Sequence, residues 1–221
     1  MLPAKEDRRL LFAAAAAGLA LIAPALLRGE GLLATAALWR VPPWNALLAP
    51  RPGAGLLADQ LLYLVPWRQF LREELLSGRF PLWNPFILGG VPFSACIQAA
   101  PFHPLNWALF WLPAAPFSLV SAFLKVFCAA LFTGLHLRRL GASERGVVVG
   151  ALTFALGGFM TVWLGHPHST SACVLPALFW ALGRLADRPS ARASRLSRRP
   201  PRPPARRWPR PRCCPTSSIT A

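Results

Sequence analysis

The chain has 221 residues, of which 54% are hydrophobic and only 14% charged, and its net charge is +16 at pH 7. Residues 188–221 contain ten arginines and no Asp or Glu, so ten of the sixteen net charges lie in this tail. The body of the chain has no basic helix interleaved with aromatic residues, which argues against a nucleic-acid-binding domain. Its five cysteines lack paired C-x-x-C spacing, which argues against a zinc site.

Four apolar runs approach the length needed to cross a bilayer, whose core of about 30 Å requires roughly 18 to 20 helical residues. They are residues 10–27, 117–137, 147–164 and 172–186. The first run follows Arg8 and Arg9, exceeds the apolar stretch of a signal peptide and has no A-x-A site before Arg28, so we interpret it as an uncleaved span. The fourth run is short, and we expect Pro176 to kink it.

Basic residues flank the predicted spans on one side of the membrane. If the N-terminus is cytoplasmic, the second span ends in the cytoplasm at Arg138 and Arg139, and the fourth ends there at Arg184. This distribution agrees with the positive-inside rule and makes residues 28–116 a long extracytoplasmic loop. We therefore predict an all-α integral membrane domain over residues 1–187, with about four transmembrane helices, in the bacterial plasma (inner) membrane.

The outer loop has the composition of a membrane-interface segment. The sequence WRQFLREELLSG places Trp67, Phe70, Leu71 and Leu75 on one stripe before Gly78, which predicts a short amphipathic helix in the membrane interface. The later sequence LNWALFWLP is too short to cross the membrane and is predicted to be interfacial or re-entrant.

The sequence GRFPLWNPFILGGVPF, residues 78–93, is too rich in proline and glycine for a helix and too apolar for an ordinary solvent loop. Irregular backbone near a bilayer must hide its polar groups in protein or in a wet cavity. Phe80, Trp83, Phe86 and Phe93 can cover the surface at headgroup depth. We therefore predict a re-entrant loop or the roof of a cavity.

The tail, residues 188–221, has eight prolines, ten arginines and no apolar periodicity, which predicts disorder. One interpretation is that it binds anionic lipid on the cytoplasmic face. The composition is also what GC-rich DNA encodes when it is read out of frame. This second interpretation favours a frameshifted or truncated end, so that the chain would be a fragment.

Candidate functional groups are those that the predicted topology brings to the extracytoplasmic face. They are Asp59, Arg68, Glu73, Glu74, Arg79, Trp83, Asn84, Gln98, His103, His166 and His168. Asp59 lies in an apolar setting, where a carboxylate is unfavourable unless it is paired, hydrogen-bonded or functional. It is either a general base or a ligand of a divalent cation, or else a helix cap or a partner of Arg68 or Arg51.

Two further features leave alternatives open. His166 and His168 are one residue apart and either bind a metal with His103 or Asp59, form a polar interfacial turn, or contact phosphate or sugar. Lys125 lies in the middle of the second predicted span, so it must face the bundle or a wet cavity, or pair with another group.

Several rare residue types recur in order along the chain. They are Asp59, Pro66-Trp67, the run from Gly78 to Pro85, Gly90 to Pro92, Gln98, and Phe102 to Asn106. This pattern, with its continuation over residues 135–167, resembles the bacterial YfhO-type multi-pass membrane proteins. The similarity covers about residues 8–188, and members of the family are far longer, so the chain resembles their N-terminal part.

That family is similar to the GT-C glycosyltransferases, which move sugars from polyprenyl-phosphate carriers to acceptors outside the cytoplasm. The resemblance implies that Asp59 is the catalytic carboxylate and that Trp83 stacks on a sugar ring. It also implies a set of substrate-binding residues that neutralise the phosphate or bind sugar hydroxyls: Arg68, Arg79, Trp83, Asn84, Gln98, His103, His166 and His168.

The implied partners are membrane lipid, a polyprenyl-phosphate-linked sugar, and an envelope glycan or lipid acceptor, with no nucleic acid. The resemblance implies no particular cofactor, and the binding of a divalent cation is one of the alternatives. The alternative function is a non-enzymatic membrane transporter or an envelope-assembly scaffold. Transport is disfavoured because Lys125 is the lone intramembrane charge and no internal repeat is visible. A further alternative is an inactive fragment with an open bundle.

Overall fold

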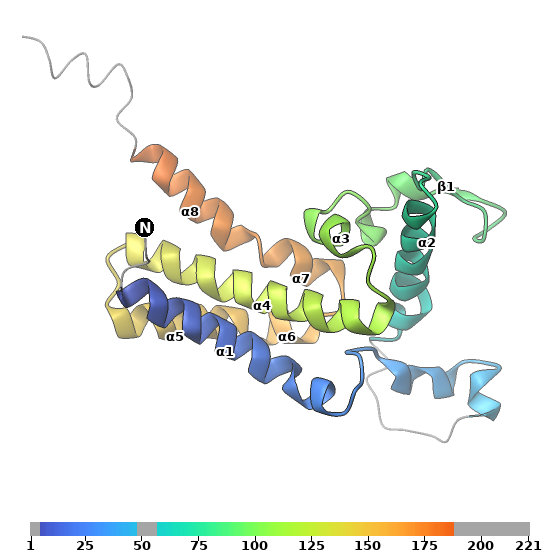
Figure 1. Cartoon of the computed structure of the whole chain (residues 1–221), viewed down its shortest axis with the longest axis horizontal. Coiled ribbons are helices and arrows are strands. Elements are labelled where there is room, and N and C mark those ends of the chain that lie inside the picture. The colour runs from blue at the N-terminus through green and yellow to red at the C-terminus, as the bar shows by residue number, and fades with distance from the viewer. Residues whose placement is uncertain (1–4, 48–56, 188–221) are drawn as a thin grey trace, which may run out of the picture. The chain divides into compact units, whose positions relative to one another are not determined.

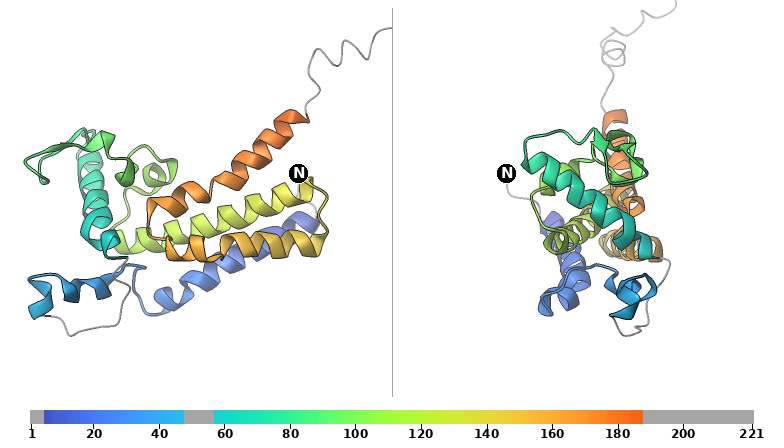
Figure 2. Two further views of the ribbon diagram at one scale, coloured as in Figure 1. Left: turned by 180° about the vertical axis from the view of Figure 1, so that it is seen from behind. Right: turned by 90° about the vertical axis from the view of Figure 1, so that its right-hand side faces the viewer.

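A computed structural model of the chain describes residues 5–47 and 57–187. The predicted disorder of the tail and the proposed partner Arg51 lie outside these residues. The helices belong to one compact unit that ends at Leu185. Figure 1 names the elements in chain order, and Figure 2 shows them from two other sides.

In the described part of the chain, four helical segments are long and apolar enough to cross a membrane. They are Asp7–Leu27, Ala114–Arg139, Glu144–Val162 and Pro167–Ala186. The prediction of a mostly helical chain with four segments able to span a membrane is therefore confirmed by their length and composition, with bounds that differ by a few residues. The first two segments are single helices, α1 (Lys5–Leu27) and α4 (Ala114–Arg139).

The third segment consists of two helices, α5 (Glu144–Ala155) and α6 (Gly158–Val162). The break lies at Leu156 and Gly157, where Gly157 has extended backbone angles and begins the second helix. A side chain on Gly157 would contact the carbonyl oxygen of Thr153, at 2.9 Å from the added Cβ. The glycine therefore allows the chain to turn closely around the end of α5.

The fourth segment also consists of two helices, α7 (Pro167–Ala172) and α8 (Leu175–Ala186). The break falls at Cys173 and Val174, just before Pro176. Proline has no backbone N–H and its ring clashes with the preceding helical turn, so a helix ends before it and restarts with proline in its first turn. The kink expected at Pro176 is thus a complete break.

Two ion pairs and one hydrogen bond show that the four segments alternate in direction. The Arg138 guanidinium lies 2.6 Å from the Asp7 carboxylate and 3.3 Å from that of Glu144. Arg139 donates a 2.8 Å hydrogen bond to the carbonyl of Gly183. The start of α1, the end of α4, the start of α5 and the end of α8 therefore share one end of the bundle. The outer loop joins the bundle at the opposite end.

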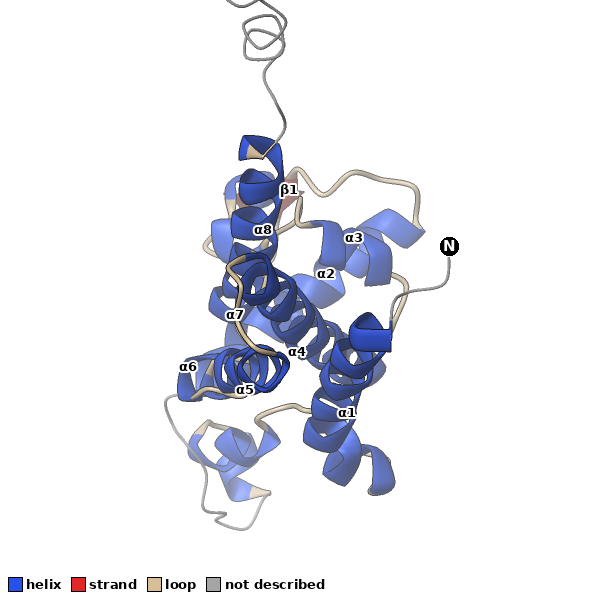
Figure 3. Ribbon diagram, turned by 90° about the vertical axis from the view of Figure 1, so that its left-hand side faces the viewer, coloured by secondary structure: helices blue, strands red, loops and turns tan. Residues whose placement is uncertain are grey.

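Small side chains make up more than half of the buried bundle core. Helix α4 packs against both α1 and α5 (Figure 3). Ala14, Ala130 and Ala155 are fully buried between these helices. Gly134 faces Leu10, and a Cβ at this glycine would collide with the leucine side chain. Small residues let helices approach closely where no water is present to drive apolar association.

The outer loop contains the predicted amphipathic helix as α2 (Val65–Leu76), which ends before Gly78 at a φ of +72°. A π-helical turn, η4 (Gln60–Leu64), precedes it. The predicted stripe packs inside the loop, because Phe70 and Leu71 are buried against Phe93. The stripe is therefore covered by the chain's own residues.

The segment 78–93 folds as a short hairpin. Strands β1 (Trp83–Asn84) and β2 (Val91–Pro92) pair antiparallel, with Trp83 opposite Pro92. Gly90 has a φ of +117°, and a Cβ there would collide with the Trp83 ring. Leu82 accepts a 2.8 Å backbone hydrogen bond from Phe93. The hairpin thus supplies hydrogen-bond partners to a segment that cannot form a helix.

Short helical turns complete the outer loop. They are η1 (Thr35–Arg40), η2 (Trp44–Ala46), η5 (Phe93–Ala95), η6 (Ile97–Ala99) and α3 (Pro104–Leu109). The ring of Phe80 stacks on Phe102 and Trp107, with ring centroids 5.8 and 6.2 Å apart. These ring contacts connect the start of the segment 78–93 to α3 and to the residues just before it.

Candidate functional site

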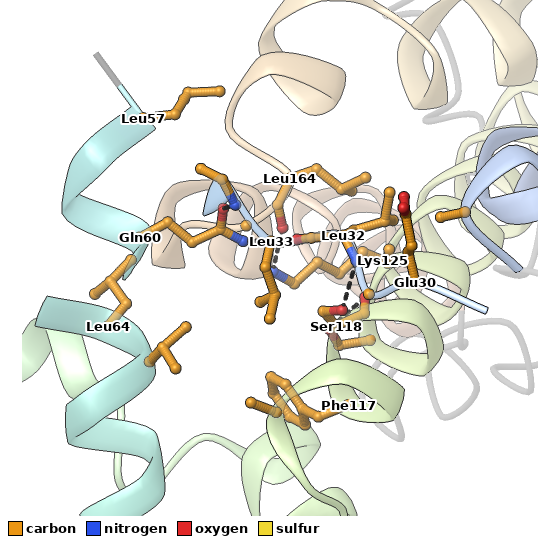
Figure 4. A pocket seen from close by; sticks show the side chains of 18 of the residues that line it. Glu30, Leu32, Leu33, Leu57, Gln60, Leu64, Phe117, Ser118, Lys125 and Leu164 are labelled. Atoms are coloured by element: carbon orange, nitrogen blue, oxygen red, sulfur yellow. Dashed lines mark hydrogen bonds between the residues drawn. The ribbon is translucent and has the colours of Figure 1, made fainter. Parts of the chain in front are cut away.

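A cavity of about 460 Å³ lies where the outer loop meets the bundle (Figure 4). Its walls come from the end of α1, residues 30–34, η4 with α2, the first half of α4, and residues 161–165. Most lining side chains are apolar. The polar and charged ones are Glu30, Gln60, Arg68, Ser118, Ser121, Lys125 and Thr161, with Arg28 at the end of α1.

Lys125 is 6% exposed and lines this larger cavity. Its ammonium group donates hydrogen bonds to the carbonyls of Leu164 and His166, at 2.8 and 3.4 Å, and to the Ser169 hydroxyl at 3.2 Å. These acceptors are all neutral. Lys125 thus faces a cavity, as expected for an intramembrane charge, and within the described ranges it forms no ion pair.

Arg68 on α2 lines the same cavity and ties the outer loop to the start of α4. Its Nη2 donates to the carbonyls of Leu109 and Leu112, each at 3.0 Å. Its guanidinium carbon lies 3.3 Å from the centre of the Phe117 ring. Burial, followed by repulsion from Arg72, lowers the pKa of Arg68 to about 10. The side chain therefore stays charged at neutral pH.

The side chains of Gln60 and Ser118 form hydrogen bonds to the backbone of residues 32–34, which borders the larger cavity. The Gln60 amide accepts from the Ala34 N–H at 3.1 Å and donates to the Leu32 carbonyl at 2.9 Å. The Ser118 hydroxyl accepts from the Leu32 N–H at 2.8 Å. A Cβ on Gly165 would collide with the Gln60 amide, so the glycine permits this close approach.

Asp59 precedes Gln60 at the start of η4 and is exposed. Its side chain accepts no capping hydrogen bond and, among the described residues, forms no ion pair. Leu57 and Gln60 line the larger cavity, but Asp59 between them does not, whereas Glu30 does. Sequence reasoning missed both Glu30 and Gln60. The available signal was a glutamine inside an apolar run next to an aspartate.

A second cavity, of about 70 Å³, shares the Arg68 and Lys125 wall with the first. Gln98, Asn106, His166 and Thr170 also line it. His166 is 6% exposed, and neither of its buried ring nitrogens has a hydrogen-bond partner in the part of the chain that the structure describes. Three predicted substrate-binding residues, Arg68, Gln98 and His166, therefore meet around this smaller cavity.

The pKa of His166 reflects the groups around it. Burial lowers this pKa, and electrostatic interactions with His168 and Lys125 lower it further. The Asp59 carboxylate opposes them and raises it. Asp59 and His166 therefore interact electrostatically, although they come from segments more than a hundred residues apart.

The remaining predicted residues are engaged in the outer loop or exposed. Arg79 forms a 2.6 Å ion pair with Glu74, and this hydrogen-bonded pair lowers the pKa of Glu74 and raises that of Arg79. The buried Asn84 side chain accepts a 2.9 Å hydrogen bond from the Phe86 N–H. Trp83, half-exposed, packs over Gly90. These contacts support the hairpin and its junction with α2.

Two predicted histidines also lie outside both cavities. The Nδ1 atom of His103 caps α3 by accepting from the Leu105 N–H at 3.2 Å. His168 is exposed, with its ring centroid 4.9 Å from Trp163 and 6.4 Å from His166. Over residues 5–47 and 57–187, no group of three or more His, Cys, Asp or Glu side chains is placed to hold a metal ion.

No protein-family model, no curated protein and no solved structure matches this chain. Function therefore has to be inferred from the two cavities and the residues around them.

Proposed function

We propose that the chain is a glycosyltransferase-like membrane protein that moves a sugar from a polyprenyl-phosphate carrier to an extracytoplasmic acceptor. It would form the N-terminal part of a longer, YfhO-like protein. The supporting observation is the larger cavity, which combines an apolar wall with the cations Lys125 and Arg68. A lipid phosphate has an apolar chain and an anionic head, so it matches both surfaces.

The proposed reaction uses Asp59 as the general base. Its carboxylate takes the proton of the acceptor hydroxyl, whose oxygen then attacks the anomeric carbon of the sugar. The bond from this carbon to the phosphate oxygen breaks, and its electron pair leaves with the lipid phosphate. Lys125 and Arg68 stabilise the negative charge that remains on the phosphate.

We also propose a location and an orientation. The chain spans the bacterial plasma membrane with its N-terminus in the cytoplasm, because Arg138, Arg139 and Arg184 lie at one end of the bundle. Labelling with a membrane-impermeant thiol reagent tests this topology. Asp59→Cys should react in intact cells and Arg139→Cys only after permeabilisation. Reaction of both from the same side would contradict the proposal.

Sugar transfer in membranes that contain the full chain and a polyprenyl-phosphate sugar tests the proposed base. Asp59→Asn should lower the rate at least about 100-fold, the minimum typical of general-base catalysis, with unchanged membrane insertion. Glu30→Gln is the matched variant, because Glu30 is the carboxylate on the cavity wall. Activity retained in Asp59→Asn but lost in Glu30→Gln would remove Asp59 from the mechanism.

A further inference from the structure

The smaller cavity is lined by positive charges and by no carboxylate of the described chain. Arg68 and Lys125 both line it. Among the described residues neither Arg68 nor Lys125 forms an ion pair, whereas Arg79 pairs with Glu74 and Arg138 pairs with Asp7 and Glu144. A buried charge without a partner of opposite sign is strongly unfavourable. An anion bound in this cavity would relieve that cost.

The same cavity also has buried nitrogens that have no hydrogen-bond partner among the described residues. They are Arg68 Nη1 and both ring nitrogens of His166. Two other polar side chains of the wall are already bonded: Asn106 donates to the Ala99 and Ala100 carbonyls, and Thr170 donates to the His166 carbonyl. Buried polar groups are almost always hydrogen-bonded, so these unused nitrogens point to a ligand.

The smaller cavity suits a small ligand. Its volume is about 70 Å³, whereas that of the larger cavity is about 460 Å³. A single tetrahedral anion is a ligand of this small size. Guanidinium groups bind phosphate through parallel N–H donors, and a neutral imidazole adds one further N–H.

We propose that the smaller cavity binds one tetrahedral oxyanion, a phosphate or the head group of a phosphate monoester, between Arg68, His166 and Lys125. Arg68 Nη1 and one His166 ring nitrogen donate hydrogen bonds to its oxygens, and the Lys125 ammonium supplies charge. This site shares Arg68 and Lys125 with the proposed site of the lipid phosphate, but it is defined by binding alone and can be tested without sugar transfer. Inorganic phosphate and a lipid monophosphate share the chemistry.

The site should bind more tightly at lower pH. The charged and titratable groups that face or act on His166 are Arg68 on α2, Asp59 before η4, Lys125 on α4 and His168 on α7. Burial holds the pKa of His166 below 6.5, so its ring is neutral at pH 7. Protonation at lower pH gives it a second N–H donor and a positive charge, both of which favour an anion.

Calorimetric titration of the full chain in detergent tests the proposal, with inorganic phosphate in one arm and a short-chain prenyl monophosphate in the other. Saturable binding of either probe is expected and supports the site. Phosphate binding identifies a free anion as a ligand, and binding of the prenyl compound alone identifies a lipid head group. Sulfate serves as the probe for pH dependence, because it does not itself titrate between pH 5.5 and 7.5.

His166→Leu should weaken binding about tenfold or more, as expected when a hydrogen bond to a charged group is lost. The control is Ser171→Leu, at an exposed position of α7 outside both cavities, and should change affinity less than about twofold. In the wild-type chain, labelled histidine side chains provide a second measurement. The ring resonances of His166 should shift on titration and those of His136, in the last turn of α4, should not.

Two results would overturn the proposal. One is the absence of saturable binding of phosphate, sulfate and prenyl monophosphate to the folded chain. The other is unchanged affinity in folded His166→Leu together with unshifted His166 ring resonances in the wild type.

Discussion

The helix bundle and the outer loop, residues 28–113, are stabilised by different kinds of side chains. In the bundle, many fully buried positions on facing helices are alanines such as Ala14 and Ala130, although larger residues such as Val126 are buried among them. In the outer loop, the buried cluster is built on the rings of Phe70 and Phe93, whose centroids lie 4.9 Å apart at 75°. Regular helices approach closely over small residues, whereas irregular backbone leaves wider gaps that large rings must fill.

This difference has a consequence for the site. The bundle fixes Lys125 and His166 through helices that pack on small residues, whereas Arg68 and Gln98 come from the aromatic-packed loop. Both cavities lie along the boundary between the two regions. A change in either region should therefore be detectable at the cavities, but each region should respond to a different type of substitution.

The largest effect is expected from Phe93→Ala, because Phe93 is 1% exposed at the centre of the loop cluster. Removal of a buried aromatic ring typically lowers the free energy of unfolding by about 3–5 kcal/mol. Hydrogen exchange should increase across α2 and α3 and stay slow in α4. The control is Phe86→Ala, since Phe86 is 82% exposed and contacts the same cluster. Equal effects of the two variants would show that the ring cluster does not organise the loop.

The bundle should respond to added volume instead. Ala14→Leu places a large side chain into the α1–α4 contact, where Ala14 is fully buried, and overpacking typically costs about 1–3 kcal/mol. Ala16→Leu, at an exposed position of the same helix, should change stability by less than about 0.5 kcal/mol. Thermal unfolding in detergent distinguishes the two variants. A similar loss in both would argue against close packing on alanine.

A smaller effect is expected where the two regions join. Ser118→Ala removes the acceptor of the Leu32 N–H and should lower the free energy of unfolding by about 1 kcal/mol. Ser121→Ala is the control, because its hydroxyl bonds only within α4, to the Ser118 carbonyl at 3.3 Å. Thiol accessibility of a cysteine at position 32 should rise in the first variant alone. No difference between them would mean that this hydrogen bond does not hold the junction.

The smallest effect concerns pH. Burial, followed by the charge of Lys125, lowers the pKa of His103 below 6.5, where its neutral ring caps α3. The unfolded chain then binds more protons than the folded one below pH 6.5, so stability falls as pH drops from 6.5 to the folded pKa. His103→Asn keeps a capping side chain without titrating and should reduce this slope, leaving the part due to His166. An identical slope in denaturant unfolding of the variant would contradict the prediction.

Some features of this protein follow from short sequence windows. The four apolar runs become the four spanning segments, and the stripe on Trp67, Phe70 and Leu71 becomes one face of α2. The break before Pro176 also follows from a local cause, the missing N–H of proline. In contrast, the hairpin at residues 83–92 was not predicted, because strands of two residues each carry no periodic signal.

The site illustrates the limit of local patterns more sharply. The sequence predicted Asp59 as the functional carboxylate because it is isolated in an apolar run. In the structure, however, the carboxylate on the wall of the larger cavity belongs to Glu30. Gln60 lines that cavity because its amide bonds to Leu32, 28 residues earlier in the chain. The residues that flank Gln60 and Leu32 in the sequence do not indicate this hydrogen bond.

The sequence by itself determined that the chain forms membrane-spanning helices, because the transfer of apolar side chains into a bilayer depends on each window of about 20 residues alone. Only the tertiary structure decided which polar groups face a cavity. Lys125 and Arg68 are held by carbonyls at least 39 residues away, and His166 is left without a partner by the packing of several segments at once. Hydrogen bonding and burial at these positions depend on three-dimensional neighbours, and those neighbours exist only after the helices and the outer loop have packed together.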